Sequence, residues 1–387
     1  MQHLVLTVLT VTSALAVGMV MALLGNLKLA LARRPEYAET RVRGLLILLN
    51  TLLIPLMLGA GLLVDQVGVR AMMIAGSVLL ALGFLAFSAS LPYERTLVAV
   101  LACAAGASAL HVATIVQLPV GIFGVSEIAA SLQMGLIFIA LGGLLAPPLL
   151  DLLLIVVGFQ RAMAMLALLF LVPAFLAAAA QGEQMFPAAE GLGRVIPMLT
   201  DPNILAAGLV FAAYAPLEAF ISVWTVAYLD NHGEARFQKR WLGWFWLAVI
   251  LSRLVCAVTL HAFDLRNTYL APFLVIPAIL AAVILGNLSG STRLTFARGG
   301  LFLLGCFLGP VYPMLLGILF TRHEVESVHG SAFGLLFACG SLGSLILSPL
   351  VHYSANHRNV QAALRIPLFV ALALSAMTLI FALLPRG

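Results

Sequence analysis

The chain has 387 residues, of which 63% are hydrophobic and 9% are charged, and its formal net charge is +5. Soluble domains are about half apolar and about a quarter charged, so this composition excludes an ordinary soluble protein. The basic residues are scattered along the chain and form no basic tract, which gives no indication of a nucleic-acid partner.

Apolar runs long enough to cross a bilayer as single helices recur along the whole chain. The runs are continuous rather than alternating, which excludes a transmembrane barrel. We therefore predict an all-α membrane protein with twelve transmembrane helices, near 4–30, 43–63, 71–91, 96–118, 129–156, 161–180, 203–228, 241–262, 268–286, 297–320, 331–352 and 363–384.

A more polar stretch after the sixth run divides the predicted helices into two sets of six. We expect an N-terminal six-helix bundle at 1–180, a cytoplasmic linker at 181–202 and a C-terminal six-helix bundle at 203–387. In transporters of this layout the substrate binds near the bilayer midplane between the halves, so a central cavity is expected. A channel or a membrane-embedded enzyme could have the same number of spans.

The motifs of common enzyme classes are missing from the sequence. It contains no P-loop, no HExxH and no GxSxG, so ATP hydrolysis, zinc proteolysis and serine hydrolysis are unsupported. We predict a protein that is not an enzyme, has no cofactor and binds no metal. The four cysteines lie in apolar runs without metal-ligand spacing and are interpreted as packing residues: Cys103, Cys256, Cys306 and Cys339.

One of the few charged stretches between apolar runs is GLLVDQVGVR, at 61–70. Gly68 allows a tight turn between two helices, and Asp65 can cap the next helix or pair with a base on a neighbouring helix. Such a contact can hold one of two arrangements of the bundles, so Gly61, Asp65, Gly68 and Arg70 are interpreted as a conformational latch. The alternative is a short solvated turn.

This stretch resembles the loop between the second and third spans of the major facilitator superfamily, G-x-L-x-D-[R/K]-x-G-x-[R/K], with Gln66 in place of the usual base. The second half resembles the fucose-permease-like branch, in the segments YAPLEAFISVWTVAY, FWLAVILSR and GCFLGPVYP. Three glycines of the branch pattern are replaced by Pro216, Ala248 and Ser252. The resemblance implies twelve helices in two bundles, cytoplasmic termini and secondary transport by alternating access.

The basic residues oppose this orientation. Most lysines and arginines outside the predicted spans fall on the side opposite the termini, which by the positive-inside rule would place the termini outside. We follow the resemblance and predict a multi-pass protein of a bacterial inner (plasma) membrane with cytoplasmic termini.

Two ionisable side chains lie near the middle of successive predicted spans. Such groups cost about 2.5–3.5 kcal/mol each on insertion scales and usually face the protein interior or water. Glu218 continues a polar stripe with Tyr214 and Ser222 at helical spacing, and Arg253 follows Trp246 by seven residues. Burial of a carboxyl group favours its protonated form, so Glu218 is predicted to bind the coupling proton and Arg253 to pair with it or contact the substrate. A permanent structural ion pair is the alternative.

Polar and aromatic side chains inside the spans form the predicted substrate site. Aromatic faces suit the stacking of sugars, and the nearby charges suit a polyhydroxylated or anionic solute. Several members have a simpler interpretation, because a lysine can reach the headgroups and a span histidine often serves packing. The predicted substrate-binding residues are Lys28, Asn50, His111, Gln117, Gln133, Tyr214, Trp224, Trp246 and Tyr312.

The sequence therefore predicts a monomeric secondary active transporter that moves a small polar solute, a sugar or an organic acid, by alternating access. Proton-coupled symport is the leading mechanism. Its expected partners are the small-molecule substrate, protons and membrane lipid, with no nucleic acid. The alternatives are an exporter or drug-efflux protein, which needs a larger and more apolar cavity, and a non-transporting membrane sensor.

Overall fold

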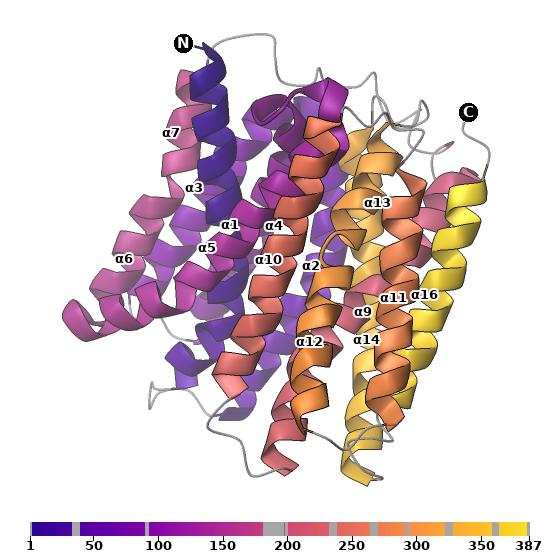
Figure 1. Cartoon of the computed structure of the whole chain (residues 1–387). Helices are drawn as coiled ribbons and strands as arrows, with labels where there is room; N and C mark the ends of the chain where they lie inside the picture. Colours follow the sequence, from indigo (N-terminus) through magenta and orange to yellow (C-terminus); the bar gives the residue numbers. More distant parts are fainter. Residues whose placement is uncertain are drawn as a thin grey trace. The chain divides into compact units, whose positions relative to one another are not determined.

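The computed structural model describes residues 2–32, 39–89, 93–180, 197, 200–231, 238–263, 270–290, 294–321, 328–357 and 364–384 (Figure 1). In these ranges the chain is helical and contains no strand. In chain order the helices of the first half are α1 (Gln2–Ala32), α2 (Glu39–Val67), α3 (Val69–Ser88), α4 (Tyr93–Gly121), the 3₁₀ turn η1 (Val125–Glu127), α5 (Ile128–Val156), α6 (Gly158–Phe170) and α7 (Val172–Ala179). Those of the second half are α9 (Pro202–Asn231), α10 (Gln238–Ala262), α11 (Ala271–Gly290), α12 (Leu294–Leu308), α13 (Val311–Phe320), α14 (His329–His357) and α16 (Arg365–Leu383).

The helices coincide with the predicted apolar runs. Eleven segments of the described residues are long and apolar enough to cross a membrane, and α2 adds the shorter apolar stretch Thr51–Val67. These twelve segments confirm the predicted all-α fold class. The predicted linker at 181–202 lies almost entirely outside the described residues.

Two of the spans are interrupted next to prolines. Between α6 and α7 the break falls at Leu171, and Pro173 lies in the first turn of α7, where its missing N–H has no helical acceptor. Between α12 and α13 the break falls at Gly309 and Pro310. Prolines remove backbone donors, so each break leaves carbonyl oxygens that need other partners.

The chain divides into two compact units. Unit 1 contains residues 1–126, 135–195 and 327–335, and unit 2 contains residues 127–134, 196–326 and 336–387. The start of α5 thus belongs to unit 2, and the start of α14 belongs to unit 1. The domain boundaries at 180 and 203 remain predictions.

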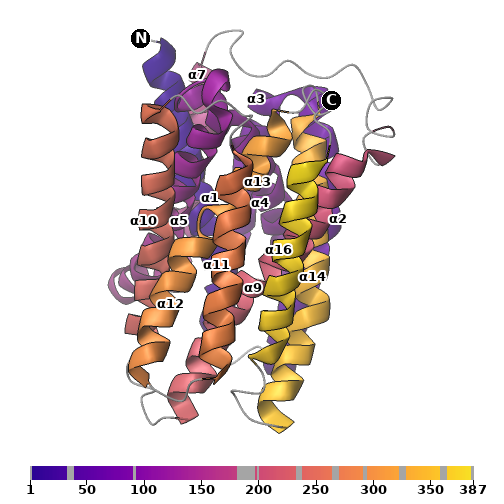
Figure 2. The ribbon, with the colours of Figure 1, turned by 45° about the vertical axis from the view of Figure 1, so that its right-hand side comes forward.

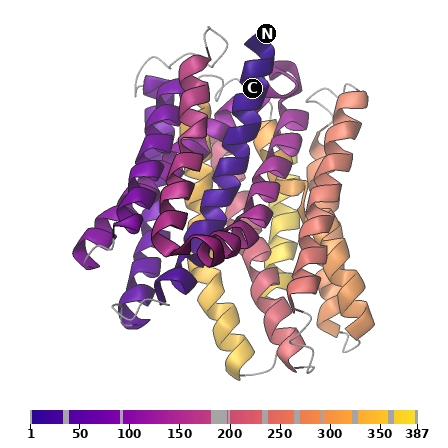
Figure 3. The same ribbon diagram turned by 90° about the vertical axis from the view of Figure 1, so that its left-hand side faces the viewer.

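In unit 1, helices approach each other at glycines, and α1 is the helix that runs down from the mark N in Figure 3. A Cβ atom at Gly18 of α1 would collide with the carbonyl oxygen of Ile139 of α5, and one at Gly142 would collide with the carbonyl oxygen of Leu15. These reciprocal contacts fix α1 against α5, since no side chain separates the two backbones.

Unit 2 shows the same kind of packing, with α11 and α16 side by side (Figure 2). A Cβ atom at Gly343 of α14 would collide with the backbone of Ala212 of α9. Gly305 of α12 lies against the backbone of Phe245 of α10 in the same way. These contacts join α14 to α9 and α12 to α10, and α9 in turn neighbours α10.

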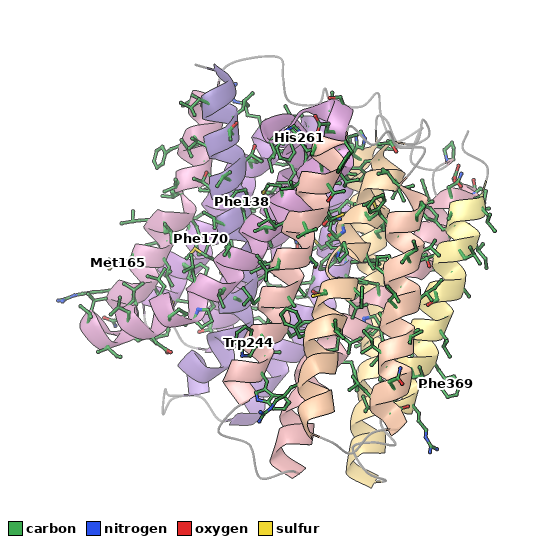
Figure 4. The ribbon with its side chains drawn as sticks, viewed as in Figure 1. Phe138, Met165, Phe170, Trp244, His261 and Phe369 are labelled. Carbon is green, nitrogen blue, oxygen red and sulfur yellow. The ribbon has the colours of Figure 1, made fainter. Side chains whose placement is uncertain are left out.

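Large apolar side chains cover the outer faces of both units. Met165 of α6 and Phe369 of α16 point away from the ribbon and are 48% and 68% exposed, respectively (Figure 4). Phe170, in contrast, is fully buried and packs on Phe84 with ring centroids 5.0 Å apart. Exposed apolar side chains along helices of this length suit contact with lipid tails.

Candidate functional site

The two ionisable groups predicted for the proton site lie together in unit 2. Glu218 of α9 is half-buried, and Arg253 of α10 is 5% exposed. The two side chains interact electrostatically, and both also interact with the buried hydroxyl groups of Tyr214 and Tyr312. A charged pair inside apolar spans avoids the full cost of burying either charge alone.

Arg253 has a second partner that the sequence analysis missed. Its Nε atom donates a hydrogen bond of 2.9 Å to the carbonyl oxygen of Gly309, at the break between α12 and α13. In a regular helix that oxygen would accept from the N–H of residue 313, which is Pro313 and has no N–H. The spacing of Gly309 and Pro313 in the sequence is the signal that predicts a free carbonyl here.

Gln133 of α5 supports the same break. Its Nε2 atom donates a hydrogen bond of 3.0 Å to the carbonyl oxygen of Pro310, which also accepts from the N–H of Met314 at 3.1 Å. The side chain is fully buried, and its Oε1 atom has no hydrogen-bond partner among the described residues. Gln133 is therefore engaged by the protein backbone rather than by an exposed binding surface.

The aromatic residues beside the pair form a closed stack. Tyr312 lies against Phe211 with ring centroids 4.8 Å apart and an interplanar angle of 30°, and Tyr214 completes the group at 6.0 Å from Phe211 and 6.1 Å from Tyr312. All three side chains are buried. The ring faces of the three residues lie against one another. A solute could therefore contact the hydroxyl groups of the two tyrosines more easily than their ring faces. The Tyr214 hydroxyl forms no hydrogen bond of standard geometry with the described residues.

The remaining predicted substrate residues are only partly described. Trp246 is half-buried and packs edge-on against Phe245 at 5.3 Å. The side chains of Lys28, Asn50 and Trp224 lie outside the described residues. Their assignment to the substrate site remains a prediction.

Two predicted residues occupy the core of unit 1 on α4. His111 is 8% exposed and its ring packs edge-on against Phe333 at 5.3 Å. Gln117 is fully buried, and neither polar atom of its amide group has a hydrogen-bond partner among the described residues. Unpaired buried amides are costly, which singles out Gln117 as a candidate for contact with a polar solute.

The latch residues make contacts within unit 1. The Asp65 carboxylate accepts hydrogen bonds from the N–H groups of Gly330 and Ser331, at 2.9 and 2.7 Å, and from the Ser331 hydroxyl at 2.5 Å. Asp65 therefore caps the N-terminus of α14, whereas the next helix, α3, begins at Gly68 with no side-chain cap. The other possibility for Asp65 was a pair with a basic side chain. The three donors found here are neutral groups instead.

The glycines of the motif explain how α14 reaches Asp65. A Cβ atom at Gly61 would collide with the carbonyl oxygen of Gly330, and a Cβ atom at Gly330 would meet the carbonyl oxygen of Gly61 at 2.7 Å. Gly68 is the whole connection between α2 and α3, with a φ of 86° that favours glycine. Arg70 is exposed and its Nη2 atom donates to the carbonyl oxygen of Ala178, near the end of α7, at 2.7 Å.

A further ion pair links η1 to the end of α10. The Nδ1 atom of His261 lies 2.6 Å from Oε2 of Glu127, and both side chains are accessible to solvent. Figure 4 labels His261 at this end of α10. Sequence analysis missed the pair because the residues lie 134 positions apart and belong to no motif. Within the described residues, no group of three or more His, Cys, Asp or Glu side chains could hold a metal ion.

Comparison with solved structures identifies the class of fold. The chain superimposes on the E. coli fucose:proton symporter FucP with a TM-score of 0.79 and 15% sequence identity, covering 98% of this chain and 99% of that one. It is similar to the human organic anion transporter MFSD10 (TETRAN), with a TM-score of 0.73, 14% identity and coverage of 97% and 98%. It is also similar to the proton:xylose symporter XylE, with a TM-score of 0.72, 12% identity and coverage of 98% and 95%.

These likenesses show that the chain has the twelve-helix major facilitator fold, as the motif at 61–70 implied. A second matched structure of FucP, with a TM-score of 0.79 and 16% identity, is in the outward conformation. No family model matches the sequence, and no curated protein matches it.

Proposed function

We propose that this protein is a secondary active transporter that moves a small polar solute, a sugar or an organic acid, by alternating access coupled to protons. The observation that carries the proposal is the Glu218–Arg253 pair inside the spans of a major facilitator fold. Two of the matched structures are proton symporters of sugars, which supports the same chemistry here.

In this proposal Glu218 is the proton-binding group. Arg253 stabilises the charged form of Glu218, whereas the apolar surroundings stabilise its neutral form. Because the two effects oppose each other, a small change near Glu218 can bind or release the proton. Arg253 stays charged throughout and modulates Glu218 or contacts the solute. The hydroxyl groups of Tyr214 and Tyr312 and the amide of Gln117 are candidates for hydrogen bonds to the solute.

The Asp65 cap is proposed to hold the protein in one of its conformations. Three bonds join one carboxylate to the start of α14, and they would all be lost together if α14 moved away from α2. We propose that this conformation is the outward-open one. We also propose that the protein is a monomer in the inner membrane of a bacterial cell, with both termini in the cytoplasm. Labelling a cysteine placed at Arg70 from each side of the membrane tests this orientation, which the arginine distribution opposes.

The experiment begins with purified protein and a panel of neutral hexoses, pentoses and small carboxylates, scored by the rise in thermal stability that binding produces. A solute that stabilises the protein is then used in proteoliposomes with and without an inward proton gradient. Gradient-driven accumulation supports symport, and a rate that ignores the gradient contradicts it. A sensor that does not transport would bind the solute without accumulating it.

The Glu218→Gln variant tests the proton site. It should lose accumulation against a gradient yet keep solute exchange, because exchange does not require release of the proton. Glu127→Gln is the matched control, since it makes the same chemical change at a solvent-accessible carboxylate outside the pair. Full accumulation by Glu218→Gln would clear this residue of the role.

A further inference from the structure

An arginine and a tryptophan are stacked where two spans of unit 2 begin. The guanidinium carbon of Arg298, on α12, lies 4.7 Å from the centroid of the Trp241 ring, on α10. The two residues lie at the starts of the apolar segments Ala297–Phe320 and Trp241–Ala262. Helices α10 and α12 are neighbours and begin at the end of unit 2 opposite the C-terminus (Figures 1 and 2). The pair therefore lies at the edge of the apolar zone.

The guanidinium group of Arg298 is available to a ligand. It is exposed, whereas Trp241 is only 6% exposed, and it forms no ion pair or hydrogen bond with the described residues. Stacking engages the flat face of a guanidinium, while its five N–H bonds lie in the plane of the group. The buried ring thus orients Arg298 and leaves its donors free, which reduces the entropy lost when an anion binds.

The starts of both helices are basic in sequence. Lys239 and Arg240 directly precede Trp241 in the first turn of α10, and neither α10 nor α12 contains an aspartate or a glutamate. Glu234 is the nearest acidic residue before α10, and it lies outside the described residues. Basic residues beside a membrane attract anionic lipids. The charge at this end of the two helices therefore favours a lipid with a net negative charge.

Apolar side chains continue along α10 from the same end. Trp244 is 51% exposed, and Leu247 and Leu251 follow it on the same face of the helix and are also exposed. Figure 4 labels Trp244 near the start of α10. A molecule bound by Arg298 thus has exposed apolar surface next to it. This combination suits a phospholipid, in which a phosphate and acyl chains are joined, better than free phosphate.

We propose that Arg298, oriented by Trp241, binds the phosphate group of an anionic phospholipid at the start of α10 and α12. The planar fork of donors fits two phosphate oxygens, and the exposed face of α10 contacts the acyl chains. A zwitterionic lipid carries its own cation, which the basic residues repel. The simpler alternative is that Arg298 only extends into the headgroup layer, without preference for any lipid. The proposal is independent of what the protein transports.

Native mass spectrometry of the purified full chain tests the site. The protein is titrated with phosphatidylglycerol or with phosphatidylcholine of the same acyl chains. The first phosphatidylglycerol should bind about tenfold more tightly, since each cation near a membrane surface favours an anionic headgroup by about fivefold. In Arg298→Met this preference should fall to about twofold or less. Arg298→Lys keeps the charge but loses the planar fork, so its preference should be intermediate.

Arg365→Met is the matched control. Arg365 is also exposed, is the first residue of the apolar segment Arg365–Leu383 of α16, in the same unit, and has no aromatic partner among the described residues. Helix α16 begins at the same end as α10 and α12 (Figure 2). An arginine that only extends into the headgroups is equivalent at both positions, so the proposal requires Arg365→Met to keep the preference.

The role of the stack is tested at Trp241. Trp241→Leu removes the ring but leaves every charge in place, and it should lose about half or more of the preference. Trp241→Phe retains a ring face and should lose less. Thermal unfolding of each variant in phosphatidylcholine alone shows whether it is folded, so a general loss of stability is separated from a loss of lipid selectivity.

A soluble competitor distinguishes the lipid from free phosphate. Millimolar inorganic phosphate or glycerol 3-phosphate should not displace phosphatidylglycerol, and displacement would show that the site takes free phosphate, which overturns the proposal. Equal binding of the two lipids, an unchanged preference in Arg298→Met, or the same loss in Arg365→Met as in Arg298→Met would also overturn it.

Discussion

Replacing Asp65 with alanine removes the cap of α14 and leaves three donors without their acceptor. Two of them are backbone N–H groups of the first turn, from Gly330 and Ser331, which have no acceptor within the helix. The third is the Ser331 hydroxyl. We expect the first turns of α14 to open locally while the rest of unit 1 stays folded.

The size of the effect follows from the geometry. Loss of a helix cap costs about 0.5–2 kcal/mol, and a hydrogen bond to a charged group contributes about 1.5–3 kcal/mol. The three bonds share one carboxylate and are not additive, and Asp65 is 9% exposed, so water replaces only part of them. We expect a loss of about 2–4 kcal/mol, which is about 30- to 700-fold in the local opening equilibrium.

Hydrogen exchange of the peptide that contains Gly330 and Ser331 measures this opening directly. Asp65→Asn has nearly the same shape, yet its amide group presents N–H to a site that offers only donors, so it should behave like Asp65→Ala. Asp151→Asn, at an exposed carboxylate of α5, is the control and should leave exchange unchanged.

Full protection of this peptide in Asp65→Asn would refute the reasoning, because it would mean that shape rather than charge and acceptor number holds α14 in place. A smaller loss in Ser331→Ala than in Asp65→Ala is also required, since that variant removes one bond and leaves two.

Three further predictions concern packing and charge. The double variant Arg253→Met/Glu218→Gln should lose less stability than the sum of the losses in the two single variants. A double-mutant cycle of thermal unfolding should give an interaction energy of about 1 kcal/mol or more, and strict additivity would show that the two side chains do not interact. Gly18→Ala should lower the melting temperature, since its Cβ meets the carbonyl of α5, whereas Gly59→Ala meets nothing within 4 Å and should be neutral or stabilising. Glu127→Gln should change the unfolding free energy by less than about 1 kcal/mol, because its ion pair is exposed, and a larger loss would contradict that.

The positions of the spans could be predicted from the sequence because the length of an apolar run is a local property. The predicted run 129–156 became α5 (Ile128–Val156), and 241–262 became the apolar part of α10. The motif at 61–70 was placed as a loop, but α2 continues to Val67 and the connection is Gly68 alone. Helical propensity and packing extended α2 across residues whose polarity had indicated a turn.

The partners of the site residues were harder to predict, since they depend on contacts between distant segments. Arg253 was expected to pair with Glu218 or to contact the substrate, and that role stays a prediction, although its charge acts on Glu218. Its bond to Gly309 requires knowing that α10 passes the break between α12 and α13, 56 residues away. The donors to the Asp65 carboxylate, from Gly330 and Ser331, lie 265 and 266 residues along the chain, so no local pattern could predict them.

The crossing of α2 and α14 at Gly61 and Gly330 has a thermodynamic consequence. Two glycines, a serine and a carboxylate meet there beside the buried side chain of Val64, so separating the helices exposes peptide groups and charge as well as apolar surface. The heat-capacity change of an opening scales with the apolar area it exposes and is reduced by polar area. Opening at this crossing should therefore have a smaller heat-capacity change than opening a wholly apolar contact of the same area, and its van't Hoff line should be correspondingly less curved.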